Sequence, residues 1–283
     1  MSPFDPPLEP GEILAAIPGR FDEVHPIKAG GQGAVFRTAT SAMHPLGRGS
    51  HLALKVYFVD QMEERTDREV AALQRIRVET LVRFVDNGRC ELREVACMWL
   101  ETEFIEGESL AGLIVQGPRP ISEVARTAHD VALALVAIWD ERIVHRDVKP
   151  DNIMVTPQGR AILIDLGVAR HVDLSSLTTR GRTWGTEGYL SPEQAIARRS
   201  LTCKSDVFAL GVAAQESILG RHPTQRRQQL LMNGGPNTRG LRAAVPPEFA
   251  ATIDDMVRRD PVGRPHPVDV AARMRPFMEG DEY

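Results

Sequence analysis

The stretch Val-His-Arg-Asp-Val-Lys-Pro-Asp-Asn-Ile-Met-Val at residues 144–155, followed by Ile-Leu-Ile-Asp-Leu-Gly at 162–167, decides the fold of this chain. Asp147 and Asn152 lie five residues apart in one loop, and Asp165 follows after a Pro-Gln-Gly turn. The apolar segments on either side of this turn predict a hairpin that brings the three oxygen-bearing side chains together. Mg²⁺ prefers oxygen ligands and is usually held by few protein groups together with substrate phosphates. The stretch therefore predicts a site for a metal-bound triphosphate.

Both segments resemble sequence motifs of the protein kinase family. Residues 145–152 (His-Arg-Asp-Val-Lys-Pro-Asp-Asn) are similar to its catalytic loop, and residues 165–167 (Asp-Leu-Gly) to its metal-binding triplet. Leu166 stands where the family more often has Phe, so the triplet keeps an apolar side chain. The other motifs of the family follow in order along the chain, and their joint occurrence is much more specific than any one of them.

The resemblance implies a role for each polar residue of the loop. Asp147 would orient the substrate hydroxyl and accept its proton, and Lys149 would offset charge on the γ-phosphate. Asn152 and Asp165 would bind Mg²⁺ or Mn²⁺. Lys149 is typical of the branch that acts on serine and threonine. The implied activity is transfer of the γ-phosphate of Mg-ATP to Ser/Thr hydroxyls of proteins.

The resemblance also implies an α+β, bilobal fold with ATP in the cleft. Residues 1–20 contain five prolines and are expected to be an irregular lead-in, with a short helical turn at 12–17. Residues 21–103 would form the N-lobe, a small antiparallel sheet with one helix. Residues 104–278 would form a larger, mostly helical C-lobe, and residues 279–283 a frayed C-terminus.

The bulk composition narrows the class of protein. The net charge of −4 gives no indication of nucleic-acid binding, and the three cysteines lack metal-ligand spacing and favour a reduced environment. No apolar run approaches the roughly 18 residues needed to cross a bilayer, and the N-terminus does not resemble a signal peptide. We expect a cytoplasmic protein that binds neither nucleic acid nor membrane. The arginine- and alanine-rich composition favours a bacterial source.

A glycine-containing stretch at 29–35 predicts a phosphate-binding hairpin, because glycines let the backbone approach phosphates closely. An ordinary glycine hairpin is the alternative explanation. The family has a further glycine where Lys28 stands, which leaves the grip on nucleotide open. The resemblance assigns these residues to ATP binding: Ile27, Gly30, Gly31, Gly33, Val35, Ala53, Lys55, Glu69, Glu103, Ile105 and Met154.

Lys55 lies in an alternating apolar segment at 52–57, which predicts a strand. In the family the corresponding lysine contacts the α- and β-phosphates and pairs with a glutamate of the following helix. That helix is predicted at 61–76, and only the family register selects Glu69 among its acidic residues. Backbone groups of Glu103 and Ile105 would bind the adenine edge.

The segment 168–190 is polar and rich in hydroxyl groups, which is typical of a surface loop. The resemblance makes it an activation loop that is ordered by phosphorylation. Arg146, directly before the base, is typical of kinases that need this modification, because a guanidinium holds a phosphate through paired bonds. The candidate phosphorylation sites are Thr178, Thr179, Thr183, Ser175 and Ser176.

Four more residues are assigned structural roles by the resemblance. Thr186 would hydrogen-bond within the Asp147 cluster. Asp206, in an apolar helix, would accept hydrogen bonds from the catalytic-loop backbone. Glu193 would form a buried ion pair with Arg264.

Two other functions remain open from the sequence. A kinase-like scaffold usually lacks the lysine, the base or the metal-binding acid, and all three are present here. Small-molecule phosphotransferases often lack the Arg146 and Ser-Pro-Glu patterns. Protein substrates are therefore expected, with self-association for trans-autophosphorylation. Several arginines lie at 221–242, where a surface loop and a short helix are expected; a docking surface for an acidic or phosphorylated partner is the alternative.

Overall fold

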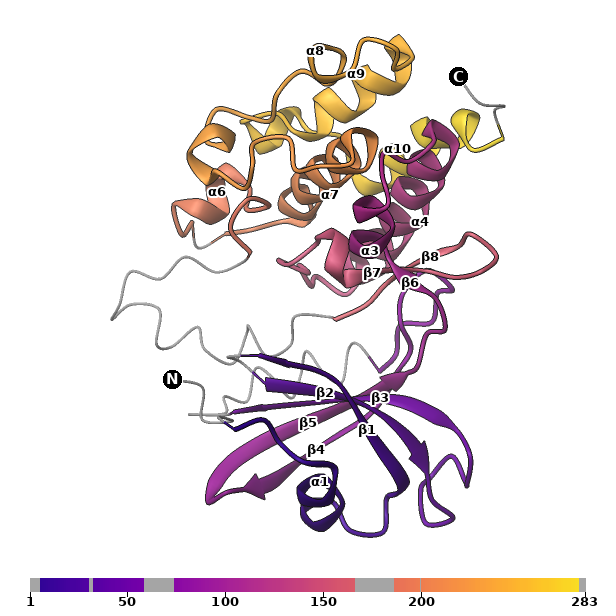
Figure 1. The fold of residues 1–283 in the computed structure, drawn as a ribbon. Coiled ribbons are helices and arrows are strands. Elements are labelled where there is room, and N and C mark those ends of the chain that lie inside the picture. Colours follow the sequence, from indigo (N-terminus) through magenta and orange to yellow (C-terminus); the bar gives the residue numbers. More distant parts are fainter. Residues whose placement is uncertain (1–5, 31–32, 59–73, 166–185, 199, 280–283) are drawn as a thin grey trace. The chain divides into compact units, whose positions relative to one another are not determined.

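The computed structural model describes residues 6–30, 33–58, 74–165, 186–198 and 200–279. They form two compact units (Figure 1). The first unit contains the described residues up to 75 together with 83–105, and the second contains 76–82 and the described residues from 106 onward. A sheet dominates the first unit and helices dominate the second, so the predicted α+β class is confirmed.

The first unit is built on a five-stranded antiparallel sheet with the strand order β1-β2-β3-β5-β4. The predicted hairpin at the glycine stretch joins β1 to β2, and the predicted strand at 52–57 lies within β3. The strands are β1 (Phe21–Gly30), β2 (Gly33–Thr40), β3 (His51–Phe58), β4 (Phe84–Leu92) and β5 (Val95–Glu103).

Residues alternate between the two faces of this sheet, as the pleat of a strand requires. Leu54 and Val56 of β3 are completely buried on one face. Val35 lies directly opposite Lys55 across the β2–β3 pair, so these two residues share the other face with Ala53. Three of the predicted ATP-binding residues therefore lie on one face of the sheet.

Residues 1–20 are not irregular throughout, because α1 (Pro10–Ala16) forms there and packs against the sheet (Figure 1). It overlaps the short helical turn expected at 12–17 and begins two residues earlier. Leu8, Ile13 and Ile17 are buried in one apolar cluster with side chains of β1, β2, β3 and β5. Proline at the first helical position favours helix initiation, and residues four apart lie on the same helix face. Prolines in the sequence suggested irregular structure, but apolar burial determines the conformation here.

Arg93, in the turn between β4 and β5, fastens this N-terminal segment. Its guanidinium donates to both carboxylate oxygens of Glu12 at 2.7 and 2.9 Å and to the carbonyl oxygens of Pro6 and Pro7. Residues 6–17 are therefore held to the sheet both by apolar packing and by the hydrogen bonds of Arg93.

A buried ionic cluster lies in the first unit. The carboxylate of Glu101 in β5 is fully buried and accepts two hydrogen bonds from Arg20, at 2.5 and 2.7 Å. The buried ring of His44 lies 3.1 Å from the same carboxylate, and Arg20 also pairs with Asp86. Glu101 thus depends on Arg20 for its main compensating charge.

The second unit is mainly helical and contains a small three-stranded sheet, ordered β6-β7-β8. None of its described helices, nor α1, has the length and apolarity to cross a membrane. The strands are β6 (Glu108–Ser109), β7 (Ile153–Val155) and β8 (Ala161–Leu163); the helices are α3 (Leu110–Val115), α4 (Ile121–Asp140), α6 (Pro192–Ala195), α7 (Cys203–Leu219), α8 (Thr238–Leu241), α9 (Pro247–Met256) and α10 (Pro267–Met274).

Helix α7 is the centre of this unit, because it is buried on nearly all sides. Helix α4 packs beside it, and the carboxylate of Asp130 in α4 accepts the backbone N–H of Ala161 in β8 at 3.0 Å. Residues 80–82, which lie within the range expected for the N-lobe, instead bond to Leu163 of β8. These backbone bonds explain why 76–82 belongs to the second unit.

We predict that Arg20→Met lowers the free energy of unfolding of the first unit by about 3 kcal/mol, because the buried Glu101 carboxylate loses its main charge partner. Denaturant unfolding followed by hydrogen exchange at β5 amides measures the effect. Arg48→Met is the matched control, since its ion pair with Asp22 is exposed and should contribute under about 1 kcal/mol. Equal destabilisation by the two substitutions would contradict the prediction.

Candidate active site

The backbone of residues 145–146 is hydrogen-bonded to one carboxylate of α7. Asp206 accepts the backbone N–H groups of His145 at 2.9 Å and Arg146 at 2.8 Å. Asp206 is 2% exposed, and this burial raises its pKa to about 7, although the two N–H bonds act in the opposite direction. Arg146 has φ of 67°, in the left-handed region that non-glycine residues rarely adopt. The two hydrogen bonds offset the cost of that conformation.

The His145 ring also holds the backbone of this loop, through both of its nitrogens. It is buried, its Nδ1 accepts the backbone N–H of Asp147 at 3.3 Å, and its Nε2 lies 3.4 Å from the carbonyl oxygen of Ile164. These partners assign the proton to Nε2 and use both ring nitrogens. His145 therefore has a structural role.

Three side chains converge on the carboxylate of Asp147. The Lys149 Nζ lies 3.0 Å from Oδ2, the Thr186 hydroxyl donates to Oδ1 at 2.8 Å, and Asn152 Nδ2 donates to Oδ2 at 3.0 Å. Lys149 also donates to the Thr186 hydroxyl at 2.6 Å. Four of the residues singled out in the sequence thus meet in one cluster.

The orientation of Asn152 leaves its side-chain oxygen for another partner. Its amide nitrogen donates to both the carbonyl and the carboxylate of Asp147, and its backbone carbonyl accepts the N–H of Ile164 at 2.8 Å. That last bond holds Asp165, the next residue, near Asn152; Asp165 itself has φ of 60°. An amide oxygen and a carboxylate are the ligands that Mg²⁺ prefers, so the donor set fits this ion.

The predicted nucleotide-binding residues fall in both units. Gly33 is required in β2, because a Cβ atom there would come within 2.2 Å of the Val56 carbonyl oxygen. The Glu103 N–H donates to the Arg83 carbonyl at 3.0 Å, so this backbone donor is already used. The other described members are Ile27 and Gly30 in β1, Val35 in β2, Ala53 and Lys55 in β3, Ile105 after β5, and Met154 in β7.

Some predicted site residues lie outside the described residues. They are Gly31, Glu69, and the phosphorylation candidates Ser175, Ser176, Thr178, Thr179 and Thr183.

Glu193 and Arg264, which are 71 positions apart, form a buried bidentate ion pair with N–O distances of 2.6 and 2.8 Å. The remaining donors of the Arg264 guanidinium reach three backbone carbonyls, so all five are used. Burial raises the pKa of Glu193, but the hydrogen bonds and charge of Arg264 outweigh it and hold the pKa below its usual value. The ion pair joins α6, which contains Glu193, to the loop between α9 and α10, which contains Arg264.

Sequence reasoning missed two residues that position the segment 188–190. The buried ring of His222 and the buried side chain of Gln228 hydrogen-bond to the backbone of that segment. A histidine and a glutamine in a polar stretch carry no sequence signal of this role, because their partners lie more than 30 positions away.

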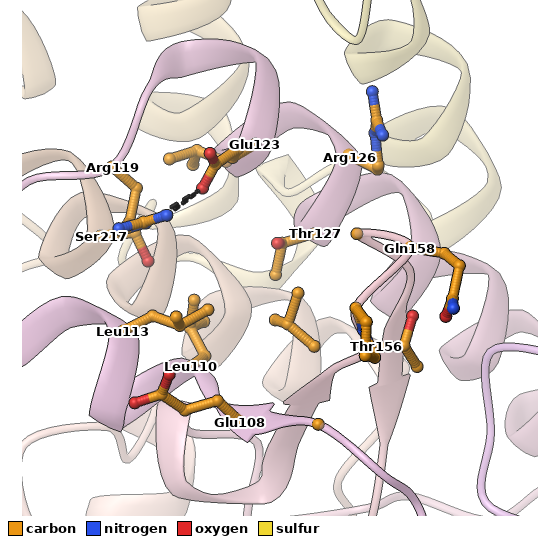
Figure 2. A pocket seen from close by; sticks show the side chains of 15 residues that line it. Glu108, Leu110, Leu113, Arg119, Glu123, Arg126, Thr127, Thr156, Gln158 and Ser217 are labelled. Carbon is orange, nitrogen blue, oxygen red and sulfur yellow. Dashed lines mark hydrogen bonds and ion pairs between the residues drawn. The ribbon is translucent and has the colours of Figure 1, made fainter.

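A separate cavity of about 720 Å³ lies among α3, α4 and the β7–β8 turn (Figure 2). An ion pair between Arg119 and Glu123 stands at one side of it, and Leu113 and Thr127 lie on its walls (Figure 2). Its charged lining residues are of both signs, and none belongs to the Asp147 cluster. This cavity is therefore not part of the candidate active site.

Comparison with known proteins decides the family. A sequence profile of the protein kinase domain matches residues 21–273. The chain belongs to the protein kinase family. The family predicted from the motifs is thus confirmed, and members of this family use ATP and a divalent metal.

The kinase domain is also similar to curated bacterial proteins. Serine/threonine-protein kinase AfsK of Streptomyces coelicolor is 31% identical over 93% of this chain and 32% of AfsK. Serine/threonine-protein kinase pkn2 of Myxococcus xanthus is 35% identical over 76% of the chain and 26% of pkn2. PknL of Mycobacterium tuberculosis is 32% identical over 72% of the chain and 52% of PknL. The chain spans about a third of AfsK, a quarter of pkn2 and half of PknL.

We predict that Arg264→Met destabilises the second unit of this kinase domain by about 3–5 kcal/mol at neutral pH, because the Glu193 carboxylate stays buried without its partner. Because the folded pKa of Glu193 is lowered, the stabilisation it supplies is present above the unfolded pKa and is lost as pH falls through the folded one. The stability gap between wild type and variant should therefore shrink in acid. Denaturant unfolding across a pH series measures the gap.

Arg258→Met is the control, since Arg258 pairs with Asp255 at an exposed position. It should change the unfolding free energy by under about 1 kcal/mol at every pH. A gap for Arg264→Met that stays constant down to strongly acidic pH would refute the assigned ion pair.

Proposed function

We propose that this domain is an ATP-dependent serine/threonine protein kinase, which transfers the γ-phosphate of ATP to Ser or Thr hydroxyls of proteins. The carrying observation is the cluster at Asp147, where an ammonium, a hydroxyl and an amide surround one buried carboxylate. The similarity to proteins named serine/threonine-protein kinases supports the same activity.

In this proposal Asp147 binds the hydroxyl of the substrate and accepts its proton as the oxygen attacks. Asn152 and Thr186 fix the carboxylate, so that little orientation is lost when substrate binds. Lys149 places a positive charge beside Asp147, where it offsets charge that develops on the transferred phosphoryl group. Positioning and charge neutralisation are the main contributions a protein makes to this reaction.

Asn152 and Asp165 would hold Mg²⁺, or Mn²⁺ in its place. When bound, the ion neutralises charge on the phosphates. Within the described residues no group of three or more His, Cys, Asp and Glu side chains forms a metal site. A site with one carboxylate, one amide and substrate phosphates is what Mg²⁺ in a nucleotide complex requires.

Residues of the first unit would bind the nucleotide. Lys55 would contact the α- and β-phosphates, and the backbone at Gly30 and Gly33 would approach them. Val35 and Ala53, on the same face as Lys55, would contact the adenine. The Glu103 carbonyl and the Ile105 backbone would bind its polar edge.

We predict that Asp147→Asn lowers label transfer from radiolabelled ATP by about 10²- to 10⁴-fold, because the amide cannot accept the hydroxyl proton. The assay follows autophosphorylation and transfer to one acidic and one basic generic protein, with Mg²⁺. Asp140→Asn is the matched control, since Asp140 is an exposed acid at the end of α4. Undiminished transfer by Asp147→Asn protein would remove Asp147 from the role of base.

Regulation by phosphorylation of the 168–190 segment is part of the proposal. Arg146 would bind the phosphate, with self-association allowing one copy to phosphorylate another. We predict that Thr178→Ala/Thr179→Ala/Thr183→Ala lowers activity by at least about tenfold, as loss of an ordering phosphate does. Mass spectrometry of active protein should locate phosphate among these residues, Ser175 and Ser176. Full activity of protein with this segment unmodified would defeat the proposal.

A further inference from the structure

The chain segment 222–228 is fastened against residues 188–190. The His222 ring donates from Nε2 to the Gly188 carbonyl at 2.9 Å. The Gln228 side chain accepts the Gly188 N–H at 3.0 Å and donates to the Leu190 carbonyl at 2.8 Å. All of these groups are buried, so side chains that project from 222–228 have a fixed position beside 188–190.

Residues 188–190 are in turn close to the proposed base. The Tyr189 N–H donates to the Thr186 carbonyl at 3.1 Å, and the Thr186 hydroxyl donates to Asp147 at 2.8 Å. A protein segment that presents its hydroxyl to Asp147 therefore passes next to 188–190 and the side chains fastened there.

Arg226 lies next to residues 188–190 in a strained turn of the backbone. Gln225 and Arg226 have φ of 53° and 61°, an arrangement that costs free energy for residues other than glycine. The Arg226 N–H is held by Nδ1 of His222 at 2.9 Å, and its guanidinium carbon lies 5.7 Å from the centre of the Tyr189 ring. The surrounding hydrogen bonds maintain the strained turn and keep Arg226 next to 188–190.

A buried carboxylate on which the charge of this arginine acts is already hydrogen-bonded. Tyr189 donates its hydroxyl to Glu216, which is buried. Burial raises the pKa of Glu216, while the Tyr189 hydrogen bond and the charge of Arg226 act against that rise. Arg226 thus serves as the cation facing Glu216, and a basic side chain of a substrate would have to compete with it.

Every exposed charged residue between positions 200 and 247 is basic, whereas Glu187, immediately before Gly188, is an exposed acid. Asp206 and Glu216 are the only acidic residues between positions 200 and 247, and both are buried. Arg226 and Arg227 are exposed and lie in no salt bridge among the described residues, although the charge of Arg226 acts on the buried Glu216. Other exposed arginines of the same region are Arg198, Arg221, Arg239 and Arg242.

We infer that Arg226 and Arg227 select protein substrates in which Glu or Asp flanks the phosphorylated Ser or Thr. The Arg226 guanidinium is held beside residues 188–190 and Arg227 is its exposed neighbour in the chain. A guanidinium binds a carboxylate through paired, charge-assisted hydrogen bonds. This inference rests on the proposed kinase function of the same site.

The test compares three peptides of one sequence with a single Thr, flanked by Glu, by Gln or by Lys. Wild-type protein should phosphorylate the Glu peptide with a kcat/KM about tenfold above that of the Gln peptide, the order of effect of two exposed ion pairs. The Lys peptide should be poorest. Arg226→Gln/Arg227→Gln should reduce the ratio of Glu to Gln peptide to below about twofold, and Arg226→Glu/Arg227→Glu should invert the order.

Arg273→Gln/Arg275→Gln is the matched control, because both arginines are exposed in the same unit but lie outside positions 200–247, in α10 and just after it. It removes the same charge and should keep the preference for Glu. A wild-type preference for Lys, equal use of the three peptides, or an equal loss in the control would overturn the inference.

Binding gives a readout independent of catalysis. Fluorescence anisotropy with Asp147→Asn protein and the same labelled peptides should show the tightest binding for the Glu peptide, weaker binding for the Gln peptide and the weakest for the Lys peptide. Added salt should reduce these differences in affinity, because it screens exposed charges. If no form of the protein phosphorylates any peptide, the kinase function fails while the binding order still decides the charge preference. Equal binding of the three peptides would overturn the inference even if phosphate transfer is observed.

Discussion

The site depends on one buried carboxylate that accepts two consecutive backbone N–H groups. Asp206 bonds the N–H groups of His145 and Arg146 from a helix that is itself buried on nearly all sides. A hydrogen bond to a charged acceptor contributes about 1.5–3 kcal/mol, and a non-glycine residue in the left-handed region costs about 1–3 kcal/mol. The pair of bonds is therefore sufficient to hold Arg146 in a conformation that turns the next residue, Asp147, toward Lys149.

Two networks from the start of α7 meet at Arg146. Asp206 takes its N–H, while the preceding residue, Ser205, donates to Glu193 at 2.8 Å. Gln194, next to Glu193, donates to the Arg146 carbonyl at 3.3 Å. The N–H of Arg146 is thus bonded to Asp206 and its carbonyl to Gln194. These bonds connect residues 193 and 194 to Arg146, the residue before Asp147.

The features that could be predicted from the sequence are those set by residues close together in the chain and those implied by the family resemblance. Asp147 and Asn152 are five residues apart, so their meeting in one loop follows from short-range geometry. The positive φ of Arg146 carries no signal in residue type, because hydrogen bonds from distant parts of the chain hold it. Burial of α1 was missed for a related reason: prolines are easy to read in a sequence, whereas the apolar surface that a short helix will cover is not.

The net charge of −4 is a poor guide to the surface that faces a substrate. Several acids of the second unit are directed inward, where the fold supplies their partners: Asp206 has two N–H donors, Glu193 has Arg264, and Glu216 has the Tyr189 hydroxyl. Charge neutralised inside the protein does not cancel the field of an exposed guanidinium. The arginines exposed between positions 200 and 247 therefore form a basic surface on a chain that is acidic on average.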